Sequence, residues 1–279
     1  MINWFKNRYS PNTILSTKIK KSLFKGKSNY QKIEIIDSYD FGRMLVLDGI
    51  VNVSEKDEFI YHEMMVHTPL FTHPNPGKIL VLGGGDGGIV RELSKHPQVK
   101  QIDLVEIDPM VVDKSKQYLP FVGVGFKDSR LKIYFEDGAR FVKSKENIYD
   151  VIIVDSPDPI GAGKRLFQNK FYENCFRALK KDGLFTAQSE TPTFKKDLRI
   201  MKSMYKKLNL IFPIVKMFTA YIPSYTTGIW CFAFCSKIYN PLKDFQRIKY
   251  EKFSFKNRYY NAAIHQASFA LPNFLQNEI

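Results

Sequence analysis

Acidic side chains follow several short apolar runs of this chain, each at a point where a β-strand would end. They are Asp86, Glu106, Asp108, Asp137, Asp155 and Asp158. Ligands of an α/β sheet bind at the carboxyl ends of its strands, so we expect these acids to surround one pocket. The rest of the chain is basic, with a net charge of +14. A negative pocket in a positive body suits small cationic ligands. Because acids also keep an amine protonated, a base must take its proton before the amine can attack.

The glycine-rich segment 82–88, LGGGDGG, has the spacing G-x-G-x-x-G of a dinucleotide site. Glu106 follows it at a distance suited to binding ribose hydroxyls, and Asp137 can accept a hydrogen bond from an adenine amino group. These features fit NAD almost as well as other nucleosides. Asp86 favours a cationic nucleoside, because two like charges about 4 Å apart repel by about 4 kcal/mol at an effective permittivity of about 20. The loop therefore predicts an S-adenosyl sulfonium ligand, with Asp86 as a helix cap the alternative.

A second acidic element, DSPDPIGAG, occupies residues 155–163. One of its two carboxylates, Asp155 or Asp158, can accept a proton from an attacking amine while the other holds a distant ammonium. The prolines stiffen the segment and the glycines permit movement, as in a lid. The alternative is an Asx-type turn whose acids cap the next helix, and this alternative has more weight for Asp158.

The pattern from Lys78 onward positions these acids by alternating strand-like and helix-like segments. Strands are expected at 78–82, 101–107, 131–136, 151–155 and 184–188, and helices at 89–96, 109–119, 139–145, 171–181 and 194–208. The runs 214–218 and 229–235 are joined by a short link and predict an antiparallel hairpin at one edge. This alternation of strands and helices predicts an α/β fold with a mostly parallel, seven-stranded, Rossmann-like sheet.

A small antiparallel β region is expected at about residues 30–53, followed by a helix over 58–71 that Pro69 ends. We therefore divide the chain into an N-terminal β-rich domain, 1–58, and a Rossmann-like domain, 59–279. The aromatic tail 258–276 is expected to pack back on the body.

Composition narrows the functional class. No run approaches the ~20 apolar residues of a membrane helix, the start lacks a secretory signal, and three scattered cysteines form no disulfide framework. A cytoplasmic location and no membrane partner are expected. The lysines are spread along the chain without arginine-rich, aromatic-interleaved tracts, so no nucleic-acid partner is expected. His62 and His67 are five residues apart, about 140° on a helix, and predict no shared metal site.

Eight motifs together resemble the polyamine aminopropyltransferases, and among them the spermidine synthases, over nearly the whole chain. They are VLDG (46–49), EKDEFIYHEMMVH (55–67), HPNP (73–76), LVLGGGDGG (80–88), VEID (105–108), DSPDPIG (155–161), IPSY (222–225) and RYYNAAIH with SFALPNF (258–274). The resemblance implies transfer of an aminopropyl group from decarboxylated S-adenosylmethionine to putrescine, giving spermidine and 5′-methylthioadenosine. It implies no cofactor, since the sulfonium compound is a co-substrate.

The resemblance also implies the roles of individual residues. Asp155 would be the general base, and Asp158 would bind the diamine in a channel lined by Tyr61, His62, Gln188 and Tyr225. The nucleoside would be held by Gln31, Asp86, Glu106, Asp137 and Gly138. The family architecture is an N-terminal β domain on a methyltransferase-like Rossmann domain, in a homodimer or homotetramer.

This sequence departs from the family pattern at Lys164 and Arg165, which place two positive charges in the expected lid over a cationic substrate. Two other functions remain open from the residues alone. One is a methyltransferase that uses S-adenosylmethionine, and the other is a non-catalytic adenosyl- or polyamine-binding regulator.

Overall fold

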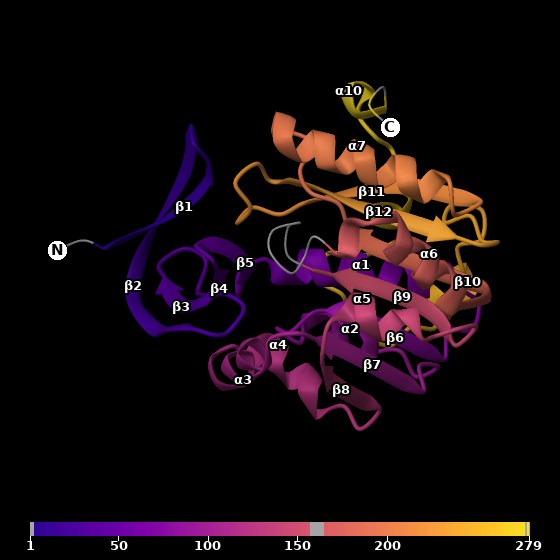
Figure 1. Ribbon diagram of the computed structural model, residues 1–279, viewed down its shortest axis with the longest axis horizontal. Coiled ribbons are helices and arrows are strands. Elements are labelled where there is room, and N and C mark those ends of the chain that lie inside the picture. Colours follow the sequence, from indigo (N-terminus) through magenta and orange to yellow (C-terminus); the bar gives the residue numbers. More distant parts are fainter. Residues whose placement is uncertain (1–2, 157–164, 277, 279) are drawn as a thin grey trace.

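The computed structural model describes residues 3–156, 165–276 and 278. The described part of the chain contains two β-sheets. The smaller sheet is antiparallel, has the order β1-β2-β3-β4-β5, and stands beside the larger α/β body (Figure 1). Its strands are β1 (Trp4–Ser10), β2 (Thr13–Lys27), β3 (Lys32–Ser38), β4 (Arg43–Leu47) and β5 (Ile50–Ser54). The expected β region is confirmed for β3 to β5, whereas β1 and β2 lie before it.

The larger sheet has seven strands in the order β11-β12-β10-β9-β6-β7-β8. They are β6 (Lys78–Gly83), β7 (Gln101–Glu106), β8 (Leu131–Phe135), β9 (Tyr149–Asp155), β10 (Leu179–Gln188), β11 (Ile214–Tyr221) and β12 (Ile229–Ser236). β12 runs antiparallel to both of its neighbours, and the other pairings are parallel. The mostly parallel sheet and its edge hairpin, β11 with β12, are therefore confirmed.

The helices are α1 (Glu58–Leu70), α2 (Gly88–Ser94), α3 (Pro109–Tyr118), α4 (Pro120–Gly123), α5 (Gly138–Lys143), α6 (Asn169–Ala178), α7 (Lys195–Asn209), α8 (Arg247–Glu251), α9 (Ala262–Ala267) and α10 (Asn273–Gln276), with a 3-10 turn η1 at Val124–Lys127.

Alternate residues of the central strands contribute to two separate cores. In β6, Ile79 and Val81 join the core beneath α1 and α2, whereas Leu80 and Leu82 join the core beneath α5, α6 and α7. Successive side chains of a strand point to opposite faces, so a strand buried on both faces has a continuous apolar sequence.

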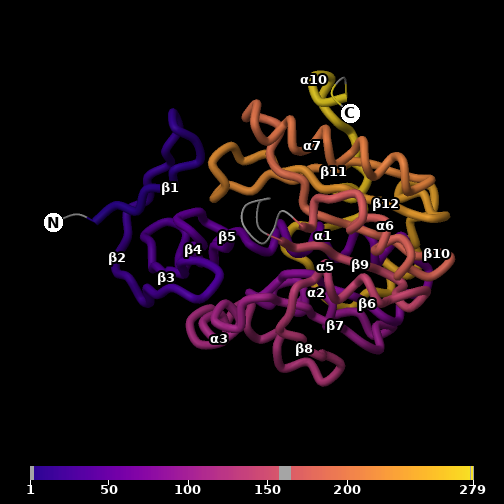
Figure 2. The backbone as a smooth tube through the Cα atoms, in the orientation of Figure 1, coloured from indigo at the N-terminus to yellow at the C-terminus, as the bar shows by residue number. Residues whose placement is uncertain are grey.

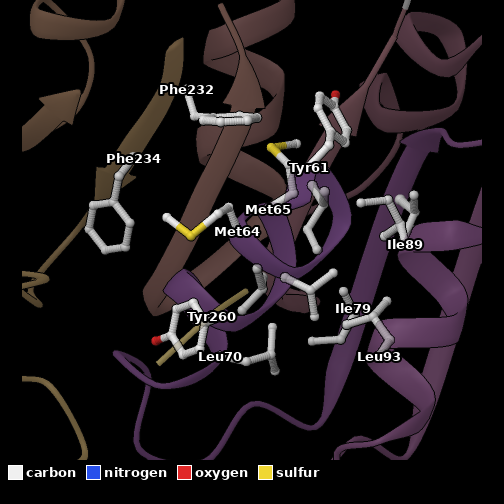
Figure 3. Close-up of a cluster of buried hydrophobic side chains, with 14 of the residues drawn as sticks. Tyr61, Met64, Met65, Leu70, Ile79, Ile89, Leu93, Phe232, Phe234 and Tyr260 are labelled. Carbon is white, nitrogen blue, oxygen red and sulfur yellow. The ribbon is translucent and has the colours of Figure 1, made fainter. Parts of the chain in front are cut away.

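Helix α1 links the small sheet to the body. In Figure 2 the chain leaves β5 and passes directly into α1 near the middle of the larger domain. Every residue of α1 except Phe59 is buried. Figure 3 shows Met64, Met65 and Leu70 within the apolar cluster, with Phe232 of β12 and Leu93 of α2 on different sides. The ring of Tyr61 borders this cluster, and its hydroxyl points away from it.

The acidic residues and histidines of α1 are buried too, and each has partners. Glu63 accepts hydrogen bonds from the backbone N–H groups of Arg258, Tyr259 and Tyr260, at 2.8, 2.9 and 2.8 Å. His67 contacts Nε2 of His96 and the carboxylate of Glu92. Buried polar groups are costly without partners, so these bonds fix the tail against α1. The expected packing of the tail is confirmed.

One predicted boundary is wrong. The helix expected over 171–181 ends at Ala178, and β10 begins at the next residue, Leu179. Leu179 is already extended and is aligned with Tyr149 of β9, so the lysines that follow belong to the strand. The expected domain boundary at residue 58 stays a prediction, although the small sheet ends at Ser54 and α1 begins at Glu58. None of the helices in the described ranges has the length and apolar character needed to cross a bilayer.

Candidate active site

A cavity of about 460 Å³ lies between the small sheet and the carboxyl ends of the large sheet. Ten of the predicted site residues line it: Gln31, Tyr61, His62, Asp86, Glu106, Asp137, Gly138, Asp155, Gln188 and Tyr225. The eleventh, Asp158, lies outside the described residues, as does Lys164. Residues that are distant in the chain are therefore brought to one place.

The sheet topology explains why the acids meet. From β6 the chain builds β7 and β8 on one side and then crosses to β9 on the other, so β6 and β9 flank the point where strand order reverses. Gly83 at the end of β6 is aligned with Asp155 at the end of β9. Gly83 has a φ of +84°, and a Cβ there would lie 1.9 Å from the carbonyl oxygen of Asp155. Glycine is required because β9 approaches so closely.

Asp155 is held by its neighbour on α1. The Tyr61 hydroxyl donates a hydrogen bond of 2.7 Å to Oδ1 of Asp155, while Oδ2 has no hydrogen-bond partner among the described residues. Burial and the nearby charge of Asp86 raise the pKa of Asp155 to about 6, against the opposing effects of His62 and Tyr61. A buried carboxylate of this kind is ionised near neutral pH and can still accept a proton.

His62, the residue after Tyr61, contacts two carboxylates. Its Nδ1 lies 2.6 Å from Oε2 of Glu58, and its Nε2 lies 3.3 Å from Oδ1 of Asp86. Burial lowers the pKa of His62, but Asp86 and Glu58 outweigh burial and raise it to about 10. His62, Asp86 and Asp155 bring ligand-type atoms within 4.8 Å of one another. We assign no metal there, because both ring nitrogens face carboxylates as donors and offer no lone pair.

Asp86 lies just before the start of α2. Its Oδ1 accepts a 2.7 Å hydrogen bond from the backbone N–H of Gly88, in the first turn of α2, but the N-cap residue of this helix is Gly87 and not Asp86. Burial acts to raise the pKa of Asp86, but His62 and the Gly88 N–H lower it overall. Asp86 therefore remains a negatively charged group on the cavity wall.

The acids at the ends of β7 and β8 differ in environment. Burial raises the pKa of Glu106 to about 7, although the Asp108 N–H donates to its Oε1 at 2.9 Å. Asp137 caps α5 through the N–H of Ala139 at 2.8 Å, and its Oδ2 pairs with Arg165 at 2.8 Å. The Arg165 side chain is 70% exposed. Exposed ion pairs are weak and exchange easily, so Arg165 does not close Asp137 to a ligand.

Asp108 does not join the cavity wall, contrary to the expectation from its place after a strand. It is fully buried, caps α3 through the N–H of Met110, and accepts from Ser28 and Gln31 at 2.6 and 3.0 Å. A cap residue must direct its side chain at the helix N-terminus. Asp108 therefore fastens the small sheet to the body and holds Gln31 at the cavity.

The remaining predicted residues are tied to the backbone. Gln188 donates to the Ser156 carbonyl at 3.1 Å and accepts from the Glu190 N–H at 3.0 Å. Tyr225 donates to the Asn52 carbonyl at 3.0 Å. Sequence reasoning missed other lining residues, namely Asn7, Arg8 and Tyr9 of β1, Asn52, Lys196 and Trp230. Tyr9 stacks on Phe194 with ring centroids 5.3 Å apart, so β1 also contacts the loop before α7. Two motifs of the sequence, VLDG and IPSY, also contribute lining residues, namely Leu47 and Asp48, and Ile222, Ser224 and Tyr225.

Comparison with known proteins agrees with this geometry. Residues 58–246 match the model of the spermine/spermidine synthase domain, and residues 3–55 match the model of the spermidine synthase tetramerisation domain. A polyamine aminopropyltransferase of Clostridioides difficile (strain 630) is 49% identical over 98% of this chain and 97% of its own length. A polyamine aminopropyltransferase of Moorella thermoacetica is 46% identical over 98% of this chain and 95% of its own length.

Two solved structures have the same fold. A spermidine synthase in complex with the transition-state analogue AdoDATO superposes with a TM-score of 0.96 at 41% identity, covering 99% of this chain and 94% of that one. The spermidine synthase of Thermotoga maritima superposes with a TM-score of 0.93 at 40% identity, covering 99% of this chain and 93% of that one. Family models, full-length relatives and superposed structures agree, and the chain belongs to the polyamine aminopropyltransferase (spermine/spermidine synthase) family.

Proposed function

We propose that this chain is a spermidine synthase, which transfers the aminopropyl group of decarboxylated S-adenosylmethionine to putrescine. The observation that carries the proposal is the set of acids at the ends of β6 to β9 around one cavity, with a tyrosine-bound carboxylate at its centre. Both substrates are cations, and a buried acidic cavity attracts cations while it repels phosphates. The same choice is supported by the relatives, which include polyamine aminopropyltransferases and a spermidine synthase.

The reaction is a displacement at the carbon next to the sulfonium. The nitrogen of putrescine attacks this carbon, the C–S bond breaks, and its electron pair goes to sulfur, giving the neutral thioether of 5′-methylthioadenosine. The leaving group needs no acid, so the protein must orient the reactants and remove a proton from the amine. We assign proton removal to Asp155, whose Oδ2 has no hydrogen-bond partner among the described residues.

We assign the substrate-binding roles to other residues that line the cavity. Asp86 would face the charged chain of the donor, Glu106 and Gln31 the ribose, and Asp137 with Gly138 the adenine. Tyr61, His62, Gln188 and Tyr225 would line the diamine channel, with Asp158 holding the distant ammonium. Asp86 also separates this donor from ordinary S-adenosylmethionine, because its carboxylate would repel the carboxylate of an amino-acid chain.

The activity can be tested directly. Purified protein incubated with decarboxylated S-adenosylmethionine and putrescine should release methylthioadenosine and spermidine, which chromatography separates. A series of diamines of different lengths, cadaverine among them, would define acceptor preference. Methyl transfer from intact S-adenosylmethionine would instead indicate a methyltransferase. Binding of either substrate without turnover would indicate a regulator and would overturn the proposal.

We also infer that the chain self-associates through its N-terminal sheet, as a homodimer or homotetramer. The match of residues 3–55 to a tetramerisation-domain model supports this inference, and β1 and β2 expose Trp4 and Ile14. Sedimentation equilibrium should show a multimer. A Trp4→Glu, Ile14→Glu double variant should shift it toward monomer, and a monomeric wild-type protein would contradict the inference.

A further inference from the structure

A buried chain of charges leads from helix α2 to the cavity. Two nitrogens of Arg91 donate to the two oxygens of Glu58, Nη1 to Oε1 at 2.6 Å and Nη2 to Oε2 at 2.9 Å. Oε2 of Glu58 also lies 2.6 Å from Nδ1 of His62. Glu58 is 4% exposed and His62 is 2% exposed. Glu58 borders the cavity, but both of its oxygens are occupied, so its influence on a ligand passes through His62.

The geometry determines the charge of the ring. An ionised carboxylate can only accept hydrogen bonds. Glu58 faces one ring nitrogen of His62 and Asp86 faces the other, so both nitrogens must carry protons and the ring is an imidazolium. The bidentate contact with Arg91 keeps Glu58 ionised and fixes its orientation. The directions of the pKa shifts agree with this geometry. Burial acts to lower the pKa of His62 and to raise that of Glu58, but Asp86 and Glu58 raise the pKa of His62 overall, and His62 and Arg91 lower that of Glu58 overall.

The position of the imidazolium matters because two acids share the space beside it. The ligand-type atoms of His62, Asp86 and Asp155 all lie within 4.8 Å of one another. Two carboxylates so close oppose each other's ionisation, and a cation beside them favours the ionised form of both. The titratable and charged groups around this cluster are Glu58 and Tyr61 on α1, Arg91 on α2 and Glu106 at the end of β7.

Resting on the aminopropyl transfer proposed above, we propose that Glu58 and Arg91 are positioning residues that lock His62 as a fixed cation beside Asp86 and Asp155, so that both acids are ionised together. The transfer needs both charges at once. Asp86 must attract the cationic donor while Asp155 is free to accept the proton of the amine. A neutral His62 would leave one of the two acids protonated over the lower part of the working pH range.

The decisive variant is Glu58→Gln, which keeps the shape of the side chain and removes its charge. Its amide can accept from Arg91 and donate to Nδ1 of a neutral His62, so the ring can keep its place. Without the imidazolium, Asp155 loses a neighbouring cation. The acid limb of the pH profile of kcat/KM should therefore move to higher pH by about one unit or more. NMR of the ring nitrogens should show that His62, charged at pH 7 in the wild-type protein, titrates near neutrality in the variant.

Glu92→Gln is the matched control. Glu92 is equally buried and also accepts from Arg91, through Nε at 2.8 Å, but it contacts His67 instead of His62. This variant should lose stability to a similar degree while the acid limb and the His62 titration stay in place. If Glu58→Gln does not fold, Arg91→Lys, which keeps the charge and loses the bidentate contact, should give a smaller shift in the same direction.

Three results would overturn the proposal. They are a neutral His62 at pH 7 in the wild-type protein, an unchanged acid limb in Glu58→Gln, and an equal shift in Glu92→Gln. Absence of aminopropyl transfer by the wild-type protein would instead refute the proposed function. In that case the NMR titration of His62 would still decide whether Glu58 and Arg91 hold it as a cation.

Discussion

The imidazole of His62 rests directly against the backbone of Gly88. A Cβ placed on Gly88 would lie 2.2 Å from Cε1 of His62 and 2.4 Å from Nδ1. Gly88 also donates its N–H to Asp86, the second carboxylate that His62 faces. The last glycine of the glycine-rich loop is therefore required by a side chain of the protein, and the loop and α1 must fit together before any ligand binds.

Gly88→Ala should displace His62 and damage the cavity. The added methyl group overlaps a ring buried by both α1 and α2, so we expect a loss of about 1–3 kcal/mol in the free energy of unfolding. Turnover should fall about tenfold or more, because the charged groups lose their relative positions. Gly77→Ala is the control, since its Cβ would meet no atom closer than 3.6 Å. Equal effects of both substitutions on turnover would contradict this explanation.

The pH dependence of the reaction should depend on Asp155. Its pKa is raised to about 6, so the rate should fall as pH drops through about 6 and the base becomes protonated. The hydrogen bond from Tyr61 lowers this pKa, and Tyr61→Phe should therefore move the acid limb to higher pH. Tyr149→Phe removes a similar bond, to Asp103 at 2.9 Å, in a place that does not line the cavity. Its acid limb should match that of the wild-type protein in the same initial-rate assay.

Asp155→Asn tests the base itself. Asparagine keeps the size and can still accept from Tyr61, so donor binding should survive. Turnover should drop by roughly 10²-fold or more, because the amine keeps its proton. Single-turnover rates together with calorimetric donor affinities separate these effects. Near-normal turnover in the variant would remove Asp155 from the role of base.

The sequence predicts most of this fold because the central strands of the large sheet are buried on both faces. Runs such as 79–82 and 151–154 are continuously apolar, and helices follow them at regular intervals. β1 and β2 have no such signal. In β2 Thr17 is the one buried residue among those described, and the lysine-rich remainder is partly or fully exposed. A strand that contacts little core has no clear alternation of apolar residues, so residues 4–27 could not be assigned from pattern.

The site was predictable where chemistry and strand ends coincide. Asp86, Glu106, Asp137 and Asp155 follow apolar runs, and topology brings them together. Asp108 looked equivalent to Glu106 in the sequence but caps α3 instead. Only Ile107 separates Glu106, which lines the cavity, from Asp108, which lies at the start of the helix. The contact of Glu58 with His62 was not predicted, because the orientation of Glu58 depends on Arg91, which lies 33 residues away in the chain. Contacts of that kind depend on packing that no local motif records.

Asp86→Asn should discriminate between donor and product. Asparagine can still accept from the Gly88 N–H, so the loop should keep its shape. The variant should lose about tenfold or more in affinity for decarboxylated S-adenosylmethionine and much less for methylthioadenosine, which lacks the sulfonium and ammonium charges. Isothermal titration calorimetry with both ligands measures the difference. Equal losses would show that Asp86 acts through structure and not through charge.

Stability at mildly acidic pH should depend on His265 in the C-terminal tail. This fully buried histidine contacts the Tyr260 hydroxyl at 2.7 Å and the Pro241 carbonyl at 2.8 Å, which suits a neutral ring. Burial lowers its pKa from 6.5 to about 4, against the opposing effect of Pro241.

The unfolded chain therefore binds this proton more readily than the folded one between these two values. The contribution of His265 is complete above pH 6.5 and is lost as pH falls toward 4, by up to about 3 kcal/mol. His265→Gln can keep both hydrogen bonds and does not titrate, so its free energy of unfolding should fall less from pH 7 to pH 5 than that of the wild-type protein. Urea titrations at pH 7 and pH 5 measure the free energy of unfolding of each protein, and the two changes can then be compared. Parallel loss in both proteins would assign the acid sensitivity to another group, since every other titrating residue is shared.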